Sequence, residues 1–215
     1  MIVGAGFSDV KFITMAPNAN NDLLIAGDYV DGFCEEQSFV FFFEESTCSI
    51  KWKFRGGDSI RFPRALSWGY DQSKAYMIST DESISARYEY LTVFRDPYDI
   101  FSPFGTPSPK TYRMEIQNTL NEIQYINGML PLPGGANDDR MLVTRFLTVS
   151  VLRFGPNYHL NLENRYDKNW KIMTVDVDST TGDFWIMQRG LFSPVEGYLA
   201  LRKFSSTQFA QSLDR

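Results

Sequence analysis

Histidine and cysteine are scarce in this sequence, with one histidine and two cysteines among 215 residues. A metal site built from several histidines of this chain is therefore excluded, and any Ser-His-Asp or Cys-His catalytic group would have to use His159. His159 falls on the polar face of a predicted outer strand, which favours an ordinary surface residue. The sequence singles out no catalytic residue, no metal ligand and no cofactor-binding residue.

An excess of positive charge is also missing. The chain has 21 Lys and Arg against 26 Asp and Glu, which gives a net charge of −5. Binding to DNA or RNA rests largely on Lys and Arg that contact phosphates, so we expect no nucleic-acid partner. No stretch approaches the ~18 consecutive apolar residues of a membrane helix, and residues 1–7 lack the basic start of a signal peptide. We expect no membrane span.

The two cysteines, Cys34 and Cys48, lie on either side of an apolar run at residues 38–45. If this run is one strand, its length is roughly 26 Å, whereas the Cα atoms of a disulfide lie within about 7 Å. The two cysteines are therefore predicted not to bond to each other. Two free thiols favour a reducing, intracellular compartment.

Aromatic residues, in contrast, are abundant, with 18 Phe, 11 Tyr and 4 Trp. Aromatic and β-branched residues favour strands. A polar turn that leads into an apolar strand recurs at residues 22–27, 73–79 and 182–187, which corresponds to a repeat of about 53 residues. A period of this size is typical of radial or stacked arrays, in which each unit buries its faces on its neighbours.

The turn signals predict four units of up to four strands each, in a single domain with limits at 8–56, 62–109, 111–167 and 169–215. We leave open that the chain is part of a longer one. The predicted strands are 10–15, 23–29, 38–45 and 49–55; then 64–70, 74–80, 89–95 and an outer strand near 99–104; then 112–118, 122–129, 141–154 and 158–166; and finally 171–177, 184–188 and 198–204. Residues 207–213 are the one segment where we allow a helix.

The pattern of apolar residues differs with the position of a strand in its unit. Residues 39–43 and 199–201 are continuous apolar runs, which predicts strands covered on both faces. Residues 49–55 alternate apolar side chains with Lys51, Lys53 and Arg55, which is typical of an exposed sheet edge. Buried inner strands with a charged outer strand describe the blade of a β-propeller. We therefore predict an all-β fold: a β-propeller or a large part of one, with about four blades of four-stranded antiparallel sheet.

The run SIKWKFRGGD at residues 49–58, followed by PRAL at 63–66 and GYDQSKAY at 69–76, resembles the bead-like repeats with a W-x-x-x-GG…A…D…Y core. Kelch- and PQQ-type propeller repeats are similar, and residues 175–185 resemble the same hairpin. The Gly-His and Trp-Asp signature of WD40 repeats is missing. The resemblance implies a fold and no particular activity, because propellers carry many unrelated functions.

Two short motifs have a functional and a structural interpretation. Gly4-Ala5-Gly6 is similar to a dinucleotide-binding fingerprint, but Asp9 replaces the third small residue and Pro17 would stop the helix that the motif needs. Asp176, Asp178 and Asp183 are spaced somewhat like calcium ligands, but the glycine falls one residue late. A hairpin turn with local aspartate hydrogen bonds is favoured for the second motif, and a glycine-containing turn for the first.

Two irregular stretches, 96–109 and 131–139, are predicted loops. The first carries four prolines together with Tyr98, Phe101 and Phe104. Aromatic side chains on a proline-stiffened loop lose little entropy on binding and often anchor interfaces, so we predict that these three residues contact a protein partner.

The predicted function is a non-catalytic protein-interaction or scaffold module within a larger assembly. The alternative is a propeller enzyme of hydrolase type with an acidic site in its central channel. A closed four-blade ring is the less favoured arrangement, because most propellers use more blades and an open array exposes apolar sheet. We expect additional chain or a partner to cover one end.

Overall fold

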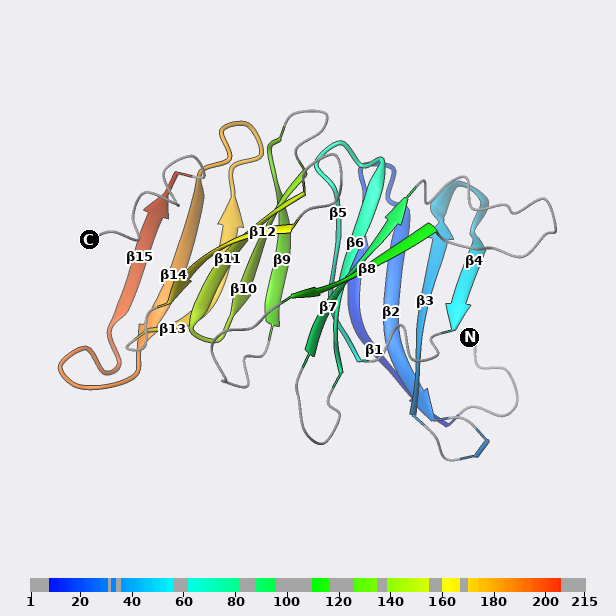
Figure 1. Ribbon diagram of the computed structural model, residues 1–215, viewed down its shortest axis with the longest axis horizontal. Helices are drawn as coiled ribbons and strands as arrows, with labels where there is room; N and C mark the ends of the chain where they lie inside the picture. The colour runs from blue at the N-terminus through cyan, green and yellow to red at the C-terminus, as the bar shows by residue number, and fades with distance from the viewer. Residues whose placement is uncertain are drawn as a thin grey trace. The chain divides into compact units, whose positions relative to one another are not determined.

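The computed structural model describes residues 8–30, 32–33, 36–55, 62–81, 88–95, 110–116, 126–134, 139–154, 160–166 and 170–205. These residues form 15 strands and one short 3-10 turn, η1 (Glu45–Thr47), and contain no α-helix (Figure 1). The prediction of an all-β protein is confirmed. The described part of the chain holds no helix with the length and apolarity that a membrane crossing requires.

The strands form four sheets in which neighbouring strands are antiparallel and follow the order of the chain (Figure 1). Sheet 1 consists of β1 (Ser8–Pro17), β2 (Leu23–Val30), β3 (Glu36–Glu44) and β4 (Ser49–Arg55). Sheet 2 consists of β5 (Pro63–Trp68), β6 (Lys74–Asp81), β7 (Tyr88–Arg95) and β8 (Lys110–Ile116). Sheet 3 consists of β9 (Ile126–Leu132), β10 (Asp139–Arg145), β11 (Thr148–Phe154) and β12 (Leu160–Tyr166). Sheet 4 consists of β13 (Trp170–Val177), β14 (Phe184–Gly190) and β15 (Leu199–Phe204).

The chain divides into two compact units. The first comprises Met1–Trp68 and Gln72–Leu120 and holds sheets 1 and 2. The second comprises Asn121–Arg215 with the three turn residues Gly69–Asp71, and it holds sheets 3 and 4. Each unit has its own buried core and is described by itself.

In the first unit, sheet 1 packs face to face on sheet 2, with the first strands β1 and β5 in contact. The Trp68 indole Nε1–H donates to the carbonyl of Ala16 at 2.9 Å, and the N–H of Leu66 donates to Thr14 Oγ1 at 3.2 Å. The Phe42 ring meets the Trp68 ring edge-on, at 5.9 Å between centroids. The buried side chains between the sheets are Ala16, Leu24, Ala26, Val40, Phe42, Leu66, Trp68, Ala75, Met77 and Phe94.

The second unit repeats this arrangement, because β13 of sheet 4 contacts β9 and β10 of sheet 3. The N–H of Ile172 donates to the carbonyl of Phe146 at 2.9 Å, which joins the start of sheet 4 to the β10–β11 turn. Phe184 stacks on Phe204 at 5.5 Å. The buried core contains Leu132, Leu142, Val149, Val151, Ile172, Phe184 and Ile186.

The first strand of every sheet contains at least one residue more than its partner strand requires. The register slips once in β5, β9 and β13 and twice in β1, where the earlier slip lies between Ser8 and Lys11. Such a bulge bends the strand and increases its local twist. The bulge that all four first strands share has Ile13, Arg64, Asn127 or Met173 as the additional residue.

The β1–β2 and β13–β14 turns are each closed by one side chain. Asn18 Oδ1 accepts the N–H groups of Asn20 and Asp22, both at 2.9 Å. Asp178 Oδ1 accepts the N–H groups of Thr180 at 2.8 Å and Thr181 at 3.2 Å, so the predicted aspartate turn is confirmed. Within the described ranges, no group of three or more His, Cys, Asp or Glu side chains is placed to hold a metal.

The strand predictions are confirmed to within a few residues in sheets 1 and 4 and in the first three strands of sheet 2. The prediction that residues 112–118 open the third unit is wrong, since β8 pairs with β7 as the fourth strand of sheet 2. The predicted strand at 122–129 is shifted to β9, and residues 141–154 form two strands separated by Phe146 and Leu147. Equal spacing misplaced these strands because surface connections differ in length at little cost in free energy.

Candidate interaction face

Sheet 4 has one covered face and one open face. On β14, Phe184, Ile186 and Gln188 are buried, whereas Met187 and Arg189 between them are exposed. The register places residues of β15 opposite those of β14, so that each pair shares a face. The outer face of sheet 4 is defined by three such pairs: Trp185 with Lys203, Met187 with Leu201, and Arg189 with Leu199.

The centre of this outer face is apolar and accessible. Met187 is 37% exposed, Leu199 69% and Leu201 71%. The prediction that residues 199–201 are covered on both faces is therefore wrong. Sheet 3 covers one face of sheet 4, while the side chains of the opposite face project away from that core.

Charged groups border the apolar centre. Lys203 Nζ lies 2.8 Å from Asp183 Oδ2 and 5.2 Å from the centre of the Trp185 ring. The ion pair is solvent-exposed and adds little to stability, but it fixes Lys203 at one end of the face. An apolar centre with a polar rim is the usual arrangement of a protein–protein interface.

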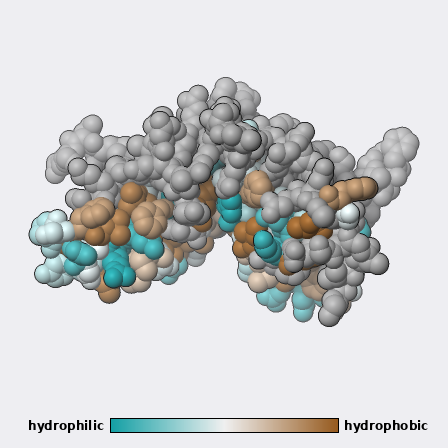
Figure 2. All heavy atoms as spheres, turned by 90° about the horizontal axis from the view of Figure 1, so that it is seen from below, coloured by the Kyte–Doolittle hydropathy of each residue, from teal (hydrophilic) through white to brown (hydrophobic). Residues whose placement is uncertain are grey.

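The connection between β14 and β15 is held closely against the end of the sheet. The N–H of Gly190 donates to the carbonyl of Tyr198 at 2.9 Å, and the N–H of Gly197 donates to the carbonyl of Gly190 at 3.1 Å. A Cβ atom on Gly190 would lie 1.7 Å from the Val195 carbonyl oxygen, so only glycine allows this approach. The connection exposes Phe192 and Tyr198, and Figure 2 shows apolar surface beside hydrophilic surface over β13–β15.

The second face of sheet 1 is open at β1. Met15, Ile25 and Phe41 share a face of β1, β2 and β3, opposite to the face that packs on sheet 2. Met15 is 61% exposed, the bulge residue Ile13 is 37% exposed, and Phe41 is 9% exposed. The outer face of sheet 1 is defined by these four residues.

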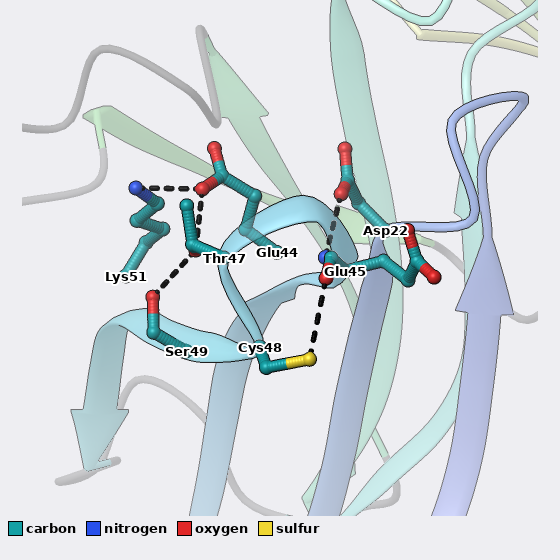
Figure 3. Close-up of polar contacts among 7 residues, drawn as sticks. All are labelled: Asp22, Glu44, Glu45, Thr47, Cys48, Ser49 and Lys51. Carbon is teal, nitrogen blue, oxygen red and sulfur yellow. Dashed lines mark hydrogen bonds and ion pairs between the residues drawn. The ribbon is translucent and has the colours of Figure 1, made fainter.

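A polar cluster closes the β3–β4 turn (Figure 3). Glu44 Oε2 accepts from Thr47 Oγ1 at 2.6 Å and lies 2.7 Å from Lys51 Nζ. These two contacts, with Lys51 first, lower the pKa of Glu44. Asp22 Oδ1 accepts the N–H of Glu45 at 3.0 Å, and the Cys48 thiol donates to the Glu45 carbonyl at 3.5 Å. Every contact in this cluster joins parts of one turn or its neighbouring hairpin, so its role is structural.

The predicted partner-binding residues Tyr98, Phe101 and Phe104 lie outside the described residues, as do His159 and Cys34. Cys48 is a free, exposed thiol. The exposure of Leu199 and Leu201 was not predicted from the sequence. One feature of the sequence could have indicated this exposure: no convincing fourth strand is predicted after residue 204, so the last sheet differs from the others.

No protein-family model matches the chain, and a search of the curated proteins finds no match either.

Proposed function

We propose that this chain is a non-catalytic protein-interaction and scaffold module of β-propeller type, and that it docks other protein chains through its open sheet faces. The observation that carries the proposal is the outer face of sheet 4. There Met187, Leu199 and Leu201 are exposed on well-paired strands. They are held in place by the sheet and lose no backbone freedom when a partner covers them.

Three features support blades of a propeller. Four antiparallel sheets follow one another in chain order. Within each unit, neighbouring sheets pack face to face and meet through their first strands, as the inner strands of adjacent blades do. The first strand of each sheet also has a bulge at a similar place, four residues before the end of the strand in β1, β5 and β13 and five before it in β9.

The exposed apolar side chains support a docking role. A soluble monomer seldom exposes a large continuous apolar patch, and such patches mark interaction sites. Among the strand residues whose burial the structure describes, which exclude β8 and β12, all the exposed large apolar side chains belong to sheets 1 and 4. The residues concerned are Ile13, Met15, Met173, Met187, Leu199 and Leu201.

The two described carboxyl groups whose pKa is shifted, those of Glu44 and Asp178, are not suited to act as general acids. A general acid needs a carboxyl group with a raised pKa. The pKa of Asp178 is lowered by hydrogen bonds from the N–H groups of Thr180 and Thr181, and that of Glu44 is lowered by Lys51 and Thr47. Both carboxylates stabilise turns.

Site-specific photo-crosslinking tests the proposal. A photoreactive amino acid at position 201 is expected to capture a protein from cells that make this chain, whereas one at Thr180, exposed in the turn of the same sheet, is not. An excess of the unlabelled chain should compete with capture, and capture from position 201 should fall when the labelled chain also carries Leu199→Asp. Equal labelling from positions 180 and 201, or none from position 201, would contradict the proposal.

A further inference from the structure

The two packed pairs of sheets follow one rule about which face is used. In the second strands, Leu23, Ala75, Met141 and Phe184 occupy equivalent places, because each pairs with the residue four positions after the bulge of the first strand. Sheets 2 and 4 turn the face of this residue toward the sheet before them, since Ala75 and Phe184 lie in the two cores. Sheets 1 and 3 turn the opposite face, that of Leu24 and Leu142, toward the sheet after them.

This rule identifies the two open faces. Trp185 on the outer face of sheet 4 is equivalent to Leu24 of sheet 1, whose face packs on the next sheet in the chain. The outer face of sheet 4 is therefore of the type that packs on a following sheet. Ile25 on the outer face of sheet 1 lies on the same side as Leu23, which is equivalent to Ala75 and Phe184. The outer face of sheet 1 is therefore of the type that packs on a preceding sheet. The two open faces are therefore complementary in type: one is missing its successor and the other is missing its predecessor.

Residues of the first strands agree with this assignment. In the packed pair of sheets 1 and 2, Thr14 follows the bulge residue directly and its Oγ1 accepts the N–H of Leu66 at 3.2 Å. Thr174 occupies the same place in sheet 4, directly after the bulge residue Met173, and it is exposed. The residue of sheet 1 equivalent to Leu66 is Met15, since both lie two residues after their bulges.

We propose that the outer face of sheet 4 binds the outer face of sheet 1 of a second copy of this chain, with Thr174 and Leu201 of one copy close to Met15 of the other. This inference rests on the proposed function and names the partner. A second copy fits the outer face of sheet 4 because its sheet 1 presents the type of face that packs on a preceding sheet. The expected contact therefore continues the packing seen between sheet 1 and sheet 2. Mutual exchange of these contacts between two chains covers both open faces of each chain.

The contact is heterologous, since two different faces meet. Each face can therefore be changed by mutation while the other stays intact. Leu201→Asp damages only the sheet 4 face and Met15→Asp only the sheet 1 face. Both side chains are more than half exposed, so neither change should unfold the chain. Phe33→Asp is the matched control, because Phe33 is 88% exposed and lies between β2 and β3, outside both faces.

Sedimentation of the full chain over a range of concentrations provides the test. The wild-type chain and Phe33→Asp are expected to reach twice the mass of one chain. Each face variant is expected to raise the dissociation constant by about 30-fold or more, as loss of an interface hot spot does. An equimolar mixture of the two face variants should recover part of the association, because one intact face of each kind remains.

Three results would overturn the inference. The wild-type chain could stay monomeric up to its solubility limit, either face variant could still associate like the wild type, or the mixture could fail to recover any association. Loss with Leu201→Asp alone would indicate a symmetric contact between two copies of sheet 4. A monomeric wild-type chain that still captures a different protein from position 201 would leave the proposed function intact and remove only the second copy as its partner. Circular dichroism of every variant must match the wild type.

Discussion

β6 of sheet 2 and β14 of sheet 4 are both second strands, paired on both sides, yet their surroundings differ. In β6, Ala75, Tyr76, Met77 and Ile78 are each at most 1% exposed. In β14, exposure alternates along the strand, and Met187 reaches 37%. Both faces of β6 are buried, whereas only one face of β14 is.

The difference shows that an apolar run does not by itself determine burial. Met77 and Met187 have the same side chain and lie in the same kind of strand. One is buried because it faces the core between sheets 1 and 2, and the other is exposed because it points away from the core between sheets 3 and 4. The free-energy gain from apolar area requires that a neighbouring layer removes that area from water.

The largest expected effect comes from truncating these two methionines. Met77→Ala should lower the free energy of unfolding by about 2–5 kcal/mol, because it leaves a cavity in a closed core. Met187→Ala should change it by about 0.5 kcal/mol or less at concentrations where the chain is monomeric, because the side chain then has no covering layer. Urea unfolding followed by tryptophan fluorescence measures both. Equal costs for the two variants would mean that the outer face of sheet 4 is covered.

Two tryptophans provide a second, smaller contrast. Trp68→Phe in sheet 2 removes the indole donor of the 2.9 Å hydrogen bond to the buried Ala16 carbonyl, which should cost about 1–3 kcal/mol. Trp185→Phe on sheet 4 keeps an aromatic ring near Lys203 and should cost about 0.5 kcal/mol. Thermal unfolding of the two variants in one buffer makes the comparison, and a larger loss for Trp185→Phe would contradict it.

The smallest expected effect is the pH dependence of the exposed turn of sheet 4. The pKa of Asp178 is lowered by the N–H groups of Thr180 and Thr181, so the ionised carboxylate stabilises the folded turn. The folded pKa lies below the unfolded one, and the stabilisation is therefore complete above the unfolded pKa and lost as the pH falls through the folded pKa.

Replacing Asp178 with Asn keeps the side-chain oxygen and removes the charge. The small difference in melting temperature between Asp178→Asn and the wild type should be present at neutral pH and disappear in strong acid. NMR titration of the Asp178 carboxyl carbon measures the pKa directly. A pKa at or above that of an ordinary aspartate would contradict the hydrogen bonds in this turn.

Local sequence patterns predicted the hairpins correctly where a short turn joins two strands. The polar run from Asn18 to Asp22 and the one from Asp178 to Asp183 mark their hairpins, because each side chain that closes the turn bonds to backbone groups within a few residues. The prediction failed at β8, where a long connection follows β7. Nothing in residues 110–116 distinguishes the fourth strand of one sheet from the first strand of the next.

The sequence by itself determined that the protein is built from strands, where the β1–β2 and β13–β14 hairpin turns lie, and that this chain cannot supply a site of several histidines. These properties depend on residue type and on contacts between near neighbours. Only the tertiary structure decided that Leu199 and Leu201 are exposed and that Met77 is buried. Burial depends on which layer faces a side chain, and that layer comes from residues far away in the sequence.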